Sequence, residues 1–479
     1  MSRENSPPRW ARTLDFLCLA IAFVSIIIAM SGGFRVRFGD TRFALTSPWR
    51  LFIWALVLGV VRHAIVPAAP IYRDLPARAI ALWKKRAARE AAAACISTRV
   101  AILFVGYMAV FMVGYREGGA PWKIDENEFL NLQARWDTGW YLGVAIDGYA
   151  DDPTRPADQQ NIVFFPAFPM LMRGAGRLLG GASTAYLLGG TLVSLVAFVW
   201  ALAYMFRFAR DTLGDADKAS AAMWLLAAYP FALFFSAAYS ESVYLLAILA
   251  ACFHFRRGEF VRAGAWGLLA GLDRAPGCFL SLALGLMAIA PWLPAWLYGR
   301  PAADESRDPS RTRRVVPALA AAAMPGVGVL LFSAYAWHLT GHPLAWEEGH
   351  AAWGRNYNGL SVLVSQRADW ILNGGLYAYT ANGGGDLLNV LGALFVIVAA
   401  WPVARGLGLP YAVLILINIL PPLAAGGFLS AGRFSSVLFP AFVWLGGAIP
   451  RGQRPAWVAA FMAVQAFCAV LFYTWRPLY

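Results

Sequence analysis

Charged residues are scarce in this 479-residue chain. Asp, Glu, Lys and Arg together make up 14% of it, whereas hydrophobic residues make up 59%. A soluble globular domain usually has about one quarter charged residues and about one half apolar residues, so the composition excludes that class. Long apolar runs separated by short charged loops instead predict an all-α, polytopic membrane protein.

Cysteine and the common cofactor motifs are also lacking. The chain has no Walker loop, GxSxG elbow or Rossmann fingerprint, so we expect no nucleotide cofactor. Its five cysteines are scattered without a CxxC pair, which argues against a disulfide framework or a cysteine zinc site. They are Cys18, Cys95, Cys252, Cys278 and Cys468.

One polar stretch is rich in histidine and glutamate without forming a metal motif. It contains His338, His342, Glu347, Glu348 and His350. Their spacing differs from that of an HExxH helix. We therefore predict no metal ligands, and the sequence leaves a requirement for a divalent ion open.

The formal net charge of +13 comes from basic residues that gather in short loops. Such loops are cytoplasmic by the positive-inside rule, so we expect membrane lipids as neighbours and no nucleic-acid partner. The apolar runs predict about 11–13 transmembrane helices, at residues 13–31, 50–68, 99–115, 184–206, 219–236, 240–255, 262–273, 276–297, 316–338, 386–403, 407–426, 434–449 and 456–474. The basic N-terminus leads into the first run without a cleavage site, and we expect that run to remain as a helix.

The pattern divides the chain into two parts. Residues 1–98 are expected to form a two-helix extension and a cytoplasmic linker that includes Arg73, Arg78 and the Ala-rich stretch 87–94. Residues 99–479 are expected to form the main transmembrane domain, with external loops at 116–183 and 339–385. Within the first loop, residues 135–149 are expected to lie along the membrane surface as an amphipathic helix.

Two proline-containing segments are expected to interrupt the helices. Residues 164–169 (FFPAFP) predict an extended re-entry into the bilayer. Residues 273–277 (DRAPG) lie between two apolar runs whose outer ends are both basic, so the chain must turn back there. Pro and Gly break a helix, and irregular backbone within a bilayer persists only where it lines a protein cavity.

The acids of the first external loop are the first candidates for catalysis. Asp137 follows Trp136, and an ionised carboxylate aimed at a sugar hydroxyl can act as a general base. Arg135 is a candidate counter-ion. The competing interpretation is that Asp137 is a helix N-cap, because WDTG before an apolar helix suits that role. The other acids of this loop include Asp125, Glu126, Asp147, Asp151 and Asp152.

Three further charges stand where apolar helices meet. Glu241 lies in FFSAAYSES (residues 234–242), either facing a cavity or stabilised by the N-terminus of its helix. Arg274 and Arg433 are lone arginines near apolar helix ends, and such residues are costly in membranes and usually functional. A guanidinium fits the forked geometry of a phosphate, although pairing with Asp273 is the alternative for Arg274.

Three motifs occur in order: RWDTGWYLGVAIDGY (135–149), NIVFFPAFPMLMR (161–173) and YPFALFFSAAYSES (229–242). Together they resemble the successive signatures of the PIG-V-like mannosyltransferases, relatives of glycosylphosphatidylinositol mannosyltransferase 2 in the GT-C class of integral membrane glycosyltransferases. The resemblance begins near residue 99 and is thin beyond about residue 300. The chain departs from eukaryotic members at Trp140-Tyr141, where those have His-Phe.

The resemblance implies a GT-C-like fold with external juxtamembrane helices. It also implies that a sugar, mannose in that family, leaves a polyprenyl phosphate and joins a hydroxyl of a glycolipid or protein by single inverting displacement. Asp137 occupies the acid position of the family's W-D motif. Asp125 and Glu126 resemble the acidic pairs of other GT-C enzymes, which makes them the second choice for the base. The expected substrate-binding residues are Arg135, Trp136, Tyr141, Phe165, Pro166, Tyr239, Glu241, Arg274 and Arg433, with Arg274 or Arg433 on the departing phosphate.

The resemblance and the composition together suggest a bacterial inner membrane, with the active site facing the periplasm or exterior. Some eukaryotic relatives depend on a small partner subunit, which this sequence does not require. Two alternatives remain: a GT-C transferase for another sugar or a protein acceptor, and a lipid or solute transporter. Transporters have midplane ionisable residues and related halves, whereas here the polar residues gather in external loops and no repeat is found.

Overall fold

The computed structural model describes residues 8–31, 34–38, 41–66, 85–150, 158–290 and 315–478. Within them the chain is almost wholly helical, which confirms the all-α polytopic architecture. One antiparallel hairpin is the exception among the described residues. Its strands, β1 (Phe34–Phe38) and β2 (Thr41–Leu45), replace the loop expected between the first two helices.

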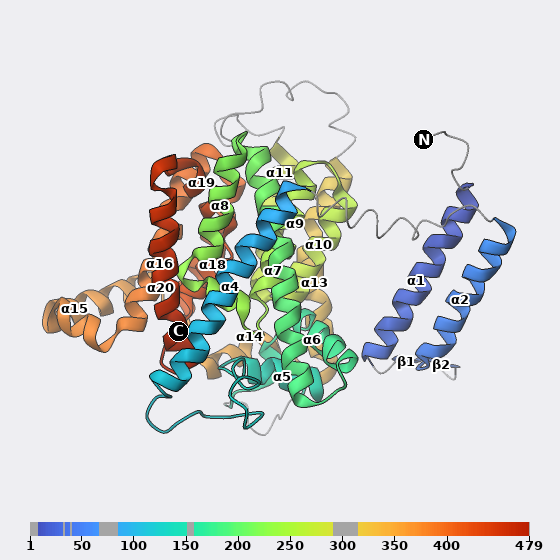
Figure 1. Ribbon diagram of the computed structural model, residues 1–479, viewed down its shortest axis with the longest axis horizontal. Coiled ribbons are helices and arrows are strands. Elements are labelled where there is room, and N and C mark those ends of the chain that lie inside the picture. The colour runs from blue at the N-terminus through green and yellow to red at the C-terminus, as the bar shows by residue number, and fades with distance from the viewer. Residues whose placement is uncertain are drawn as a thin grey trace.

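The N-terminal helices form a hairpin of their own. α1 (Arg9–Ser31) and α2 (Pro48–Ile65) stand beside the main bundle, where α1 contacts α6 (Ala167–Leu178) (Figure 1). Arg62 Nε lies 2.7 Å from an Asp15 carboxylate oxygen, and both side chains are 1% exposed. This pair joins the two helices to each other. The predictions on Arg73, Arg78, Asp151 and Asp152 concern positions outside the described residues.

Seven helices of the described chain are long and apolar enough to cross a membrane. Besides α2 they are α4 (Arg86–Met112), α7 (Ser183–Leu213), α13 (Val315–Thr340), α16 (Gly384–Gly406), α17 (Leu409–Gly426) and α20 (Arg454–Tyr473) with the short turn η9 (Arg451–Gln453) before it. α4 begins at Arg86 and buries Ala91 and Ala94. Residues 87–94 are therefore part of a packed helix and not of a linker, and α4 continues across the expected boundary at residue 98.

The remaining apolar runs form short helices in broken pairs. α8 (Ala216–Ala228) bends by 77° into η4 (Pro230–Ser236), and α9 (Glu241–Arg256) follows. α10 (Phe260–Asp273), η5 (Ala275–Phe279) and α11 (Leu280–Ile289) make a second pair, broken at the position expected from residues 273–277. α8 has 13 residues, or about 20 Å at 1.5 Å per residue, less than the roughly 30 Å of a bilayer core.

A third break replaces the helix expected at 434–449. α18 (Ala431–Ser436) ends before α19 (Phe439–Ala448) begins, with Pro440 in the first turn of α19. Proline suits the first turn because its missing N–H is not needed there. The three broken pairs bring non-helical backbone into the interior, which suits a protein-lined site.

Close helix packing surrounds the second break. A Cβ on Gly271 of α10 would lie 2.0 Å from the Pro325 carbonyl oxygen of α13, and one on Gly328 of α13 would lie 2.5 Å from the Leu268 carbonyl oxygen. Small residues let helices approach backbone to backbone in membrane proteins. The glycines therefore hold α10 and α13 in direct contact beside Arg274.

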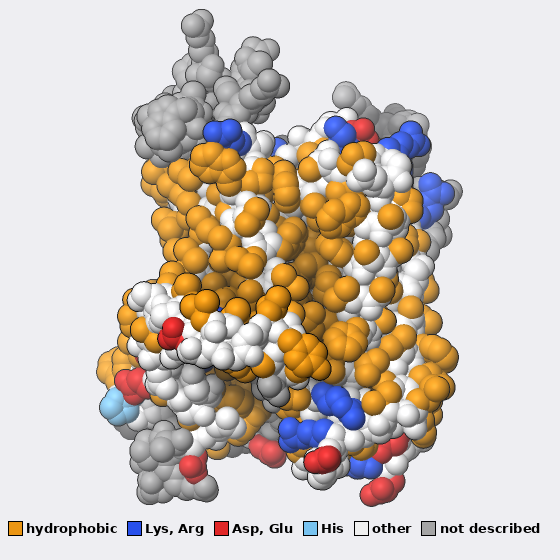
Figure 2. Space-filling model, turned by 90° about the vertical axis from the view of Figure 1, so that its left-hand side faces the viewer, with side chains coloured by type: hydrophobic (Ala, Val, Ile, Leu, Met, Phe, Trp, Pro, Cys, Tyr) orange, Lys and Arg blue, Asp and Glu red, His pale blue; other side chains and the backbone are white. Residues whose placement is uncertain are grey.

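The two ends of the bundle differ in their elements. At one end Asp217 lies 3.0 Å from Arg86 and 3.7 Å from Arg451, which brings together the starts of α4, α8 and α20. The other end holds α5 (Thr138–Ile146), α6 and α14 (Ala345–Glu348). Figure 2 shows hydrophobic side chains over the middle of one face and charged side chains toward its two ends.

Two local predictions for the first external loop need correction. The helical part of residues 135–149 is only α5, and its Val144 and Ala145 are fully buried in the core, so it is no simple surface helix. Of FFPAFP, Phe164 is extended after η3 (Asn161–Val163), but α6 already begins at Ala167. From the opposite loop, α15 (Leu360–Asn382) follows η8 (Gly349–Trp353) and projects sideways from the bundle (Figure 1).

Candidate active site

Four charged side chains meet where the broken helices converge. Arg433 Nη1 donates to Asp137 Oδ2 at 2.5 Å. Arg433 Nε donates to Glu241 Oε1, and Arg274 Nη1 donates to the same oxygen. The structure thus joins Asp137, Arg433, Glu241 and Arg274 into one chain of ion pairs.

Each member of this ion-pair chain stands at an interruption of the helices. Asp137 directly precedes α5, and Glu241 is the first residue of α9. Arg274 is the extended residue between α10 and η5, and Arg433 belongs to the short α18. At a helix break the backbone leaves the regular helical hydrogen-bond pattern, and a side chain there can be directed into the interior of a bundle.

The segments that present Asp137 and Arg433 both contain a residue with left-handed backbone. Trp136 has φ 50° and Ser430 has φ 63°, a conformation that is uncommon for residues other than glycine. Trp136 is held by its indole N–H, which donates to the Phe472 carbonyl oxygen at 3.2 Å. Backbone strain of this kind persists where the surroundings fix it, often at functional sites.

The carboxylate of Asp137 is not a helix cap. Asp137 occupies the N-cap position of α5, yet its side chain accepts no capping hydrogen bond from the backbone. Its backbone N–H instead donates to the Tyr239 hydroxyl at 3.0 Å. The side chain is 29% exposed, whereas that of Glu241 is fully buried. Asp137 is therefore the accessible carboxylate of the pair.

Aromatic rings line the two arginines. The guanidinium carbon of Arg433 lies 4.5 Å from the Tyr239 ring centroid, and that of Arg274 lies 5.4 Å from the Phe434 ring centroid. Ring faces attract cations, and more strongly when water is excluded. The rings therefore help to hold the guanidinium groups in place while the carboxylates pair with them.

Several buried acceptor oxygens near this cluster have no hydrogen-bond partner within the described residues. They are Glu241 Oε2 and both carboxylate oxygens of Asp273, next to Arg274. Thr138 Oγ1 is a further buried atom in this state. Buried polar atoms are normally satisfied, so such a group marks a place for water or for the hydroxyls of a bound molecule.

Arg135 has a structural position, contrary to its predicted role in substrate binding. It is fully buried and donates to the carbonyl oxygens of Tyr473, Asn131 and Ala134, each at 2.8 Å. Burial lowers the pKa of Arg135 from its ordinary value. The counter-ion of Asp137 is Arg433, from the far end of the sequence, and not the adjacent arginine.

Of the other predicted binding residues, Tyr239 and Tyr141 lie beside the ion pairs, whereas Phe165, Pro166 and Trp136 have other neighbours. Tyr239 and Tyr141 are buried, and the Tyr141 hydroxyl lies 3.0 Å from Ser240 Oγ. Phe165 packs on Phe332 and Trp346, away from the ion pairs. Pro166 directly precedes α6, and the Trp136 ring packs at a tilt against the Trp475 ring.

The second-choice acids are not brought into the cluster. Asp125 accepts a hydrogen bond from the Asn127 backbone N–H at 2.8 Å, and Glu126 is exposed. Neither makes a hydrogen bond or ion pair with the residues around Asp137 in the described chain. The geometry therefore favours Asp137 over both.

Sequence reasoning missed Arg355, in the connection between η8 and α15. Its guanidinium carbon lies 5.1 Å from the Phe434 ring centroid. Burial, together with the positive charges of Arg433 and Arg274, lowers the pKa of Arg355 to about 10. The sequence signal was weak, because an arginine in a polar loop beside Trp353 resembles many solvated positions.

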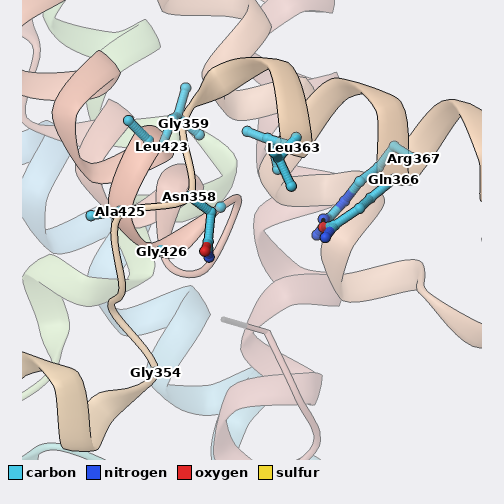
Figure 3. A pocket seen from close by; sticks show the side chains of 12 residues that line it. Gly354, Asn358, Gly359, Leu363, Gln366, Arg367, Leu423, Ala425 and Gly426 are labelled. Atoms are coloured by element: carbon cyan, nitrogen blue, oxygen red, sulfur yellow. Dashed lines mark hydrogen bonds between the residues drawn. The ribbon is translucent and has the colours of Figure 1, made fainter.

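A cavity of about 140 Å³ lies between the start of α15 and the end of α17 (Figure 3). Gly354 and Gly426 are among the residues that line it, and the polar ends of the Gln366 and Arg367 side chains of α15 lie close together there. Within the described residues no group of three His, Cys, Asp or Glu side chains is arranged to hold a metal ion.

Comparison with known proteins supports the family resemblance. The model of the family described as mannosyltransferase (PIG-V) matches residues 120–288. This range contains Asp137, Glu241 and Arg274 but neither Arg355 nor Arg433. A search of curated proteins finds no match.

Two solved structures are similar over 80% of this chain. The archaeal oligosaccharyltransferase AglB from Archaeoglobus fulgidus, in complex with an inhibitory peptide and a dolichol-phosphate, shares 13% identity with a TM-score of 0.36, and 56% of that chain is covered. The Archaeoglobus fulgidus oligosaccharyltransferase tethered to an acceptor peptide shares 12% identity with a TM-score of 0.34 and 55% coverage. The chain thus spans about half the length of these structures.

The order of the three motifs, the polytopic helical fold and the family match agree with one another. The resemblance to the PIG-V mannosyltransferases is confirmed over residues 120–288 of this polytopic helical protein.

Proposed function

We propose that the protein transfers a sugar, with mannose as the first candidate, from a polyprenyl-phosphate donor to the hydroxyl of a glycolipid. One observation carries the choice of base: Asp137 is the accessible carboxylate of a cluster whose other acid, Glu241, is sealed by two arginines. A general base must be able to reach the proton that it removes. A different sugar or a protein acceptor is the alternative within the same reaction class.

The reaction is a single displacement at the anomeric carbon. The acceptor oxygen forms a bond to that carbon while the bond from the carbon to the phosphate oxygen breaks. Asp137 takes the proton of the acceptor hydroxyl, and the phosphate leaves with the electron pair. The attack from the opposite side inverts the anomeric configuration, and no nucleotide is required because the donor is already activated.

Arg433 and Arg274 supply positive charge where the phosphate leaves. Pre-positioned cations that face developing negative charge in a site shielded from water lower the barrier of a reaction. Arg433 also fixes Asp137, because its Nη1 donates to the carboxylate at 2.5 Å. The unpartnered oxygens of Glu241 and Asp273 are suited to accept hydrogen bonds from sugar hydroxyls.

The arrangement of the bundle suggests which side of the membrane holds the site. The basic helix ends around Arg86, Arg257 and Arg451 carry charges of the kind that stay in the cytoplasm. Arg86 and Arg451 share Asp217 as a partner. Arg257 lies 3.5 Å from Asp211, which is close to Asp217 in the sequence. The segment around Asp137 belongs to the other end, so we place the reaction on the periplasmic or external face of a bacterial inner membrane.

The experiment that tests the proposal measures transfer of radiolabelled sugar from polyprenyl-phosphate mannose to extracted lipids. Purified wild-type protein in detergent, without a gradient, should transfer the label, which a transporter would not do. Asp137→Asn should lower the rate by about 100- to 10,000-fold, the usual contribution of a general base. Assays with EDTA and with added Mn²⁺ decide whether a metal takes part.

Two matched variants control for the loss of an acid in the same loop. Asp125→Asn removes the second-choice base, and Asp147→Asn removes an exposed carboxylate at the other end of α5. Both should keep near wild-type transfer. If Asp137→Asn keeps its activity while Asp125→Asn loses it, the assignment of the base is wrong. If wild-type protein transfers no sugar from this donor, the proposed sugar is wrong.

A further inference from the structure

The cavity between the start of α15 and the end of α17 has no part in the reaction proposed above. None of the four residues of the ion-pair chain lines it. Gly426 does line it, and a Cβ on Gly426 would lie 2.9 Å from Arg355 Nη1. Arg355 packs in turn on the ring of Phe434, the residue after Arg433. The cavity is therefore a separate site that lies close to the candidate active site.

The cavity combines apolar walls with polar groups. Leu363 of α15 and Leu423 of α17 line it and are buried. Asn358, Gln366 and Arg367 line it as well, and Figure 3 shows their polar ends on either side of Leu363. Ligand pockets commonly have this arrangement, in which apolar walls supply contact area and a few polar groups fix the orientation of the ligand.

Two of the polar side chains have unused hydrogen-bonding capacity. The side-chain amide of Asn358 makes no hydrogen bond within the described residues, although its backbone N–H donates to the Ala424 carbonyl oxygen at 3.0 Å. Gln366 Oε1 accepts one long bond of 3.4 Å from Arg367 Nη1. The backbone bond holds the loop that carries Asn358 against the end of α17. The cavity thus presents amide donors and acceptors from a fixed backbone.

The charges at the cavity are balanced. Arg367 Nη2 donates to Asp386 Oδ1 at 2.8 Å, and Arg367 Nε donates to Asp386 Oδ2 at 3.3 Å. Arg367 is the one charged residue among those that line the cavity, and this carboxylate compensates it. An anion would find no uncompensated cation here. The hydroxyl groups of a neutral ligand would find both donors and acceptors in the two amides.

The volume of about 140 Å³ suits a ligand with one ring. An apolar protein cavity of about 150 Å³ binds benzene, which is a six-membered ring. A hydrocarbon ring would leave the amides of Asn358 and Gln366 without partners. A pyranose ring can place its C–H groups on Leu363 and Leu423 and its hydroxyl groups on the amides. The cavity therefore fits a six-membered ring that carries hydroxyl groups.

The cavity is placed where the head group of a membrane lipid can reach it. It lies at the last turn of α17, which is long and apolar enough to cross a membrane. From there α15 projects sideways from the bundle (Figure 1). Residues 370–385 contain no charged residue, and Leu372 and Leu376 in this stretch are 81% and 62% exposed. Exposed leucines on an uncharged stretch suit contact with lipid.

We propose that this cavity binds one uncharged, polyhydroxylated ring of the lipid-linked acceptor, a pyranose or a cyclic polyol, and thereby selects the acceptor. The inference rests on the function proposed above. Because the ion-pair chain does not line the cavity, the ring bound here is not the group whose hydroxyl reacts at Asp137. It holds the acceptor while a neighbouring part of the same head group reaches Asp137. Asn358 and Gln366 are then specificity-determining residues.

The test measures binding of octyl mannoside to the full-length protein by calorimetry, in a detergent whose head group contains no sugar. Octyl tetraethylene glycol ether supplies the same tail without a ring, and methyl mannoside supplies the ring without a tail. Wild type should bind octyl mannoside at least about tenfold more tightly than either control. Equal binding of the ether would overturn the ring site, and equal binding of methyl mannoside would overturn the lipid-linked ligand.

Alanine variants test the two amides. Asn358→Ala and Gln366→Ala should each weaken binding of octyl mannoside by about two- to tenfold, the usual effect of one lost neutral hydrogen bond. Both side chains are exposed, so the variants should fold. Asn373→Ala is the matched control, because Asn373 is an exposed asparagine of α15 that does not line the cavity. It should bind like wild type. Unchanged binding by the Asn358→Ala, Gln366→Ala double variant would overturn the inference.

A change of selectivity tests the charge balance. Wild type should bind octyl mannoside more tightly than octyl mannoside 6-phosphate. Asp386→Asn leaves Arg367 without its carboxylate and should improve binding of the phosphorylated ligand by about tenfold. Misfolding does not produce such a gain. A wild type that prefers the phosphorylated ring, or an Asp386→Asn protein without the gain, would show that the cavity does not select a neutral ligand.

Sugar transfer separates this inference from the proposed function. In the double variant the KM for the glycolipid acceptor should rise, whereas the KM for the donor should stay as in wild type. An unchanged acceptor KM, or a rise in the donor KM alone, would contradict the role given to the cavity. If binding of octyl mannoside depends on Asn358 and Gln366 but no sugar is transferred, the ring site stands and the proposed reaction is wrong.

Discussion

Two groups of buried arginines in this protein differ in what they bind. Arg99 of α4, 2% exposed, donates to the Ala227 carbonyl oxygen at 2.7 Å and to Gln465 Oε1 at 3.1 Å. Arg135 likewise donates to three carbonyl oxygens. Arg433 and Arg274 instead bind carboxylates, one of which is reachable from outside the bundle.

The partners of a buried arginine distinguish a structural role from a functional one. An arginine whose donors are taken up by backbone carbonyls and neutral side chains of neighbouring segments, as in Arg99 and Arg135, holds those segments together. An arginine that shares carboxylates at a helix break positions chemically active groups. Both kinds are costly to bury, so the cost alone does not reveal the role, whereas the identity of the partners does.

The largest effect should follow the loss of Arg433. Arg433→Gln leaves Asp137 and Glu241 without their shared cation, and removing one partner of a buried ion pair costs about 3–5 kcal/mol of stability. Sugar transfer should fall by on the order of 1,000-fold, within the range expected of a disabled base. Transfer assays and thermal unfolding measure the two effects. Arg433→Lys, which keeps the charge, should recover part of the transfer activity and part of the stability. An active Arg433→Gln protein would contradict the functional role assigned to Arg433.

Arg135→Gln should have an intermediate effect on stability and almost no effect on sugar transfer. Losing the guanidinium leaves several buried carbonyl oxygens without donors, which should lower stability by about 2–4 kcal/mol. Transfer per folded molecule should stay close to wild type, because Arg135 does not contact the ion pairs. Activity normalised to the folded fraction checks this. A loss of turnover in well-folded Arg135→Gln protein would return Arg135 to the active site.

The smallest effect on stability should come from Gly432→Ala, next to Arg433. A Cβ there would lie 2.1 Å from the Phe231 ring, so the ring or α18 must move. Overpacking of this kind costs about 1–3 kcal/mol, and displacement of Arg433 should lower transfer by about tenfold or more. Gly452→Ala is the matched control, since nothing lies within 4 Å of its added Cβ. Equal behaviour of the two variants would show that Arg433 tolerates a shift.

The sequence identified most of the ion-pair cluster for a physical reason. Glu241, Arg274 and Arg433 are charges in apolar surroundings, and a membrane protein keeps such residues only where they are compensated or used. Asp137 was recognisable from its motif. Arg355 was not, because it lies in a polar loop where an arginine costs nothing. Arg135 was misassigned, since adjacency to Asp137 in the chain suggested a contact that the backbone does not allow.

Composition and periodicity by themselves determined that this chain is a polytopic helical membrane protein, because the bilayer requires long apolar helices. They also located the break at residues 273–277. Only the tertiary structure decided which charges meet: Asp137 and Arg433 are 296 positions apart, and their contact at 2.5 Å depends on how three broken helix pairs pack. Partner choice among buried charges is a property of that packing, which no local pattern encodes.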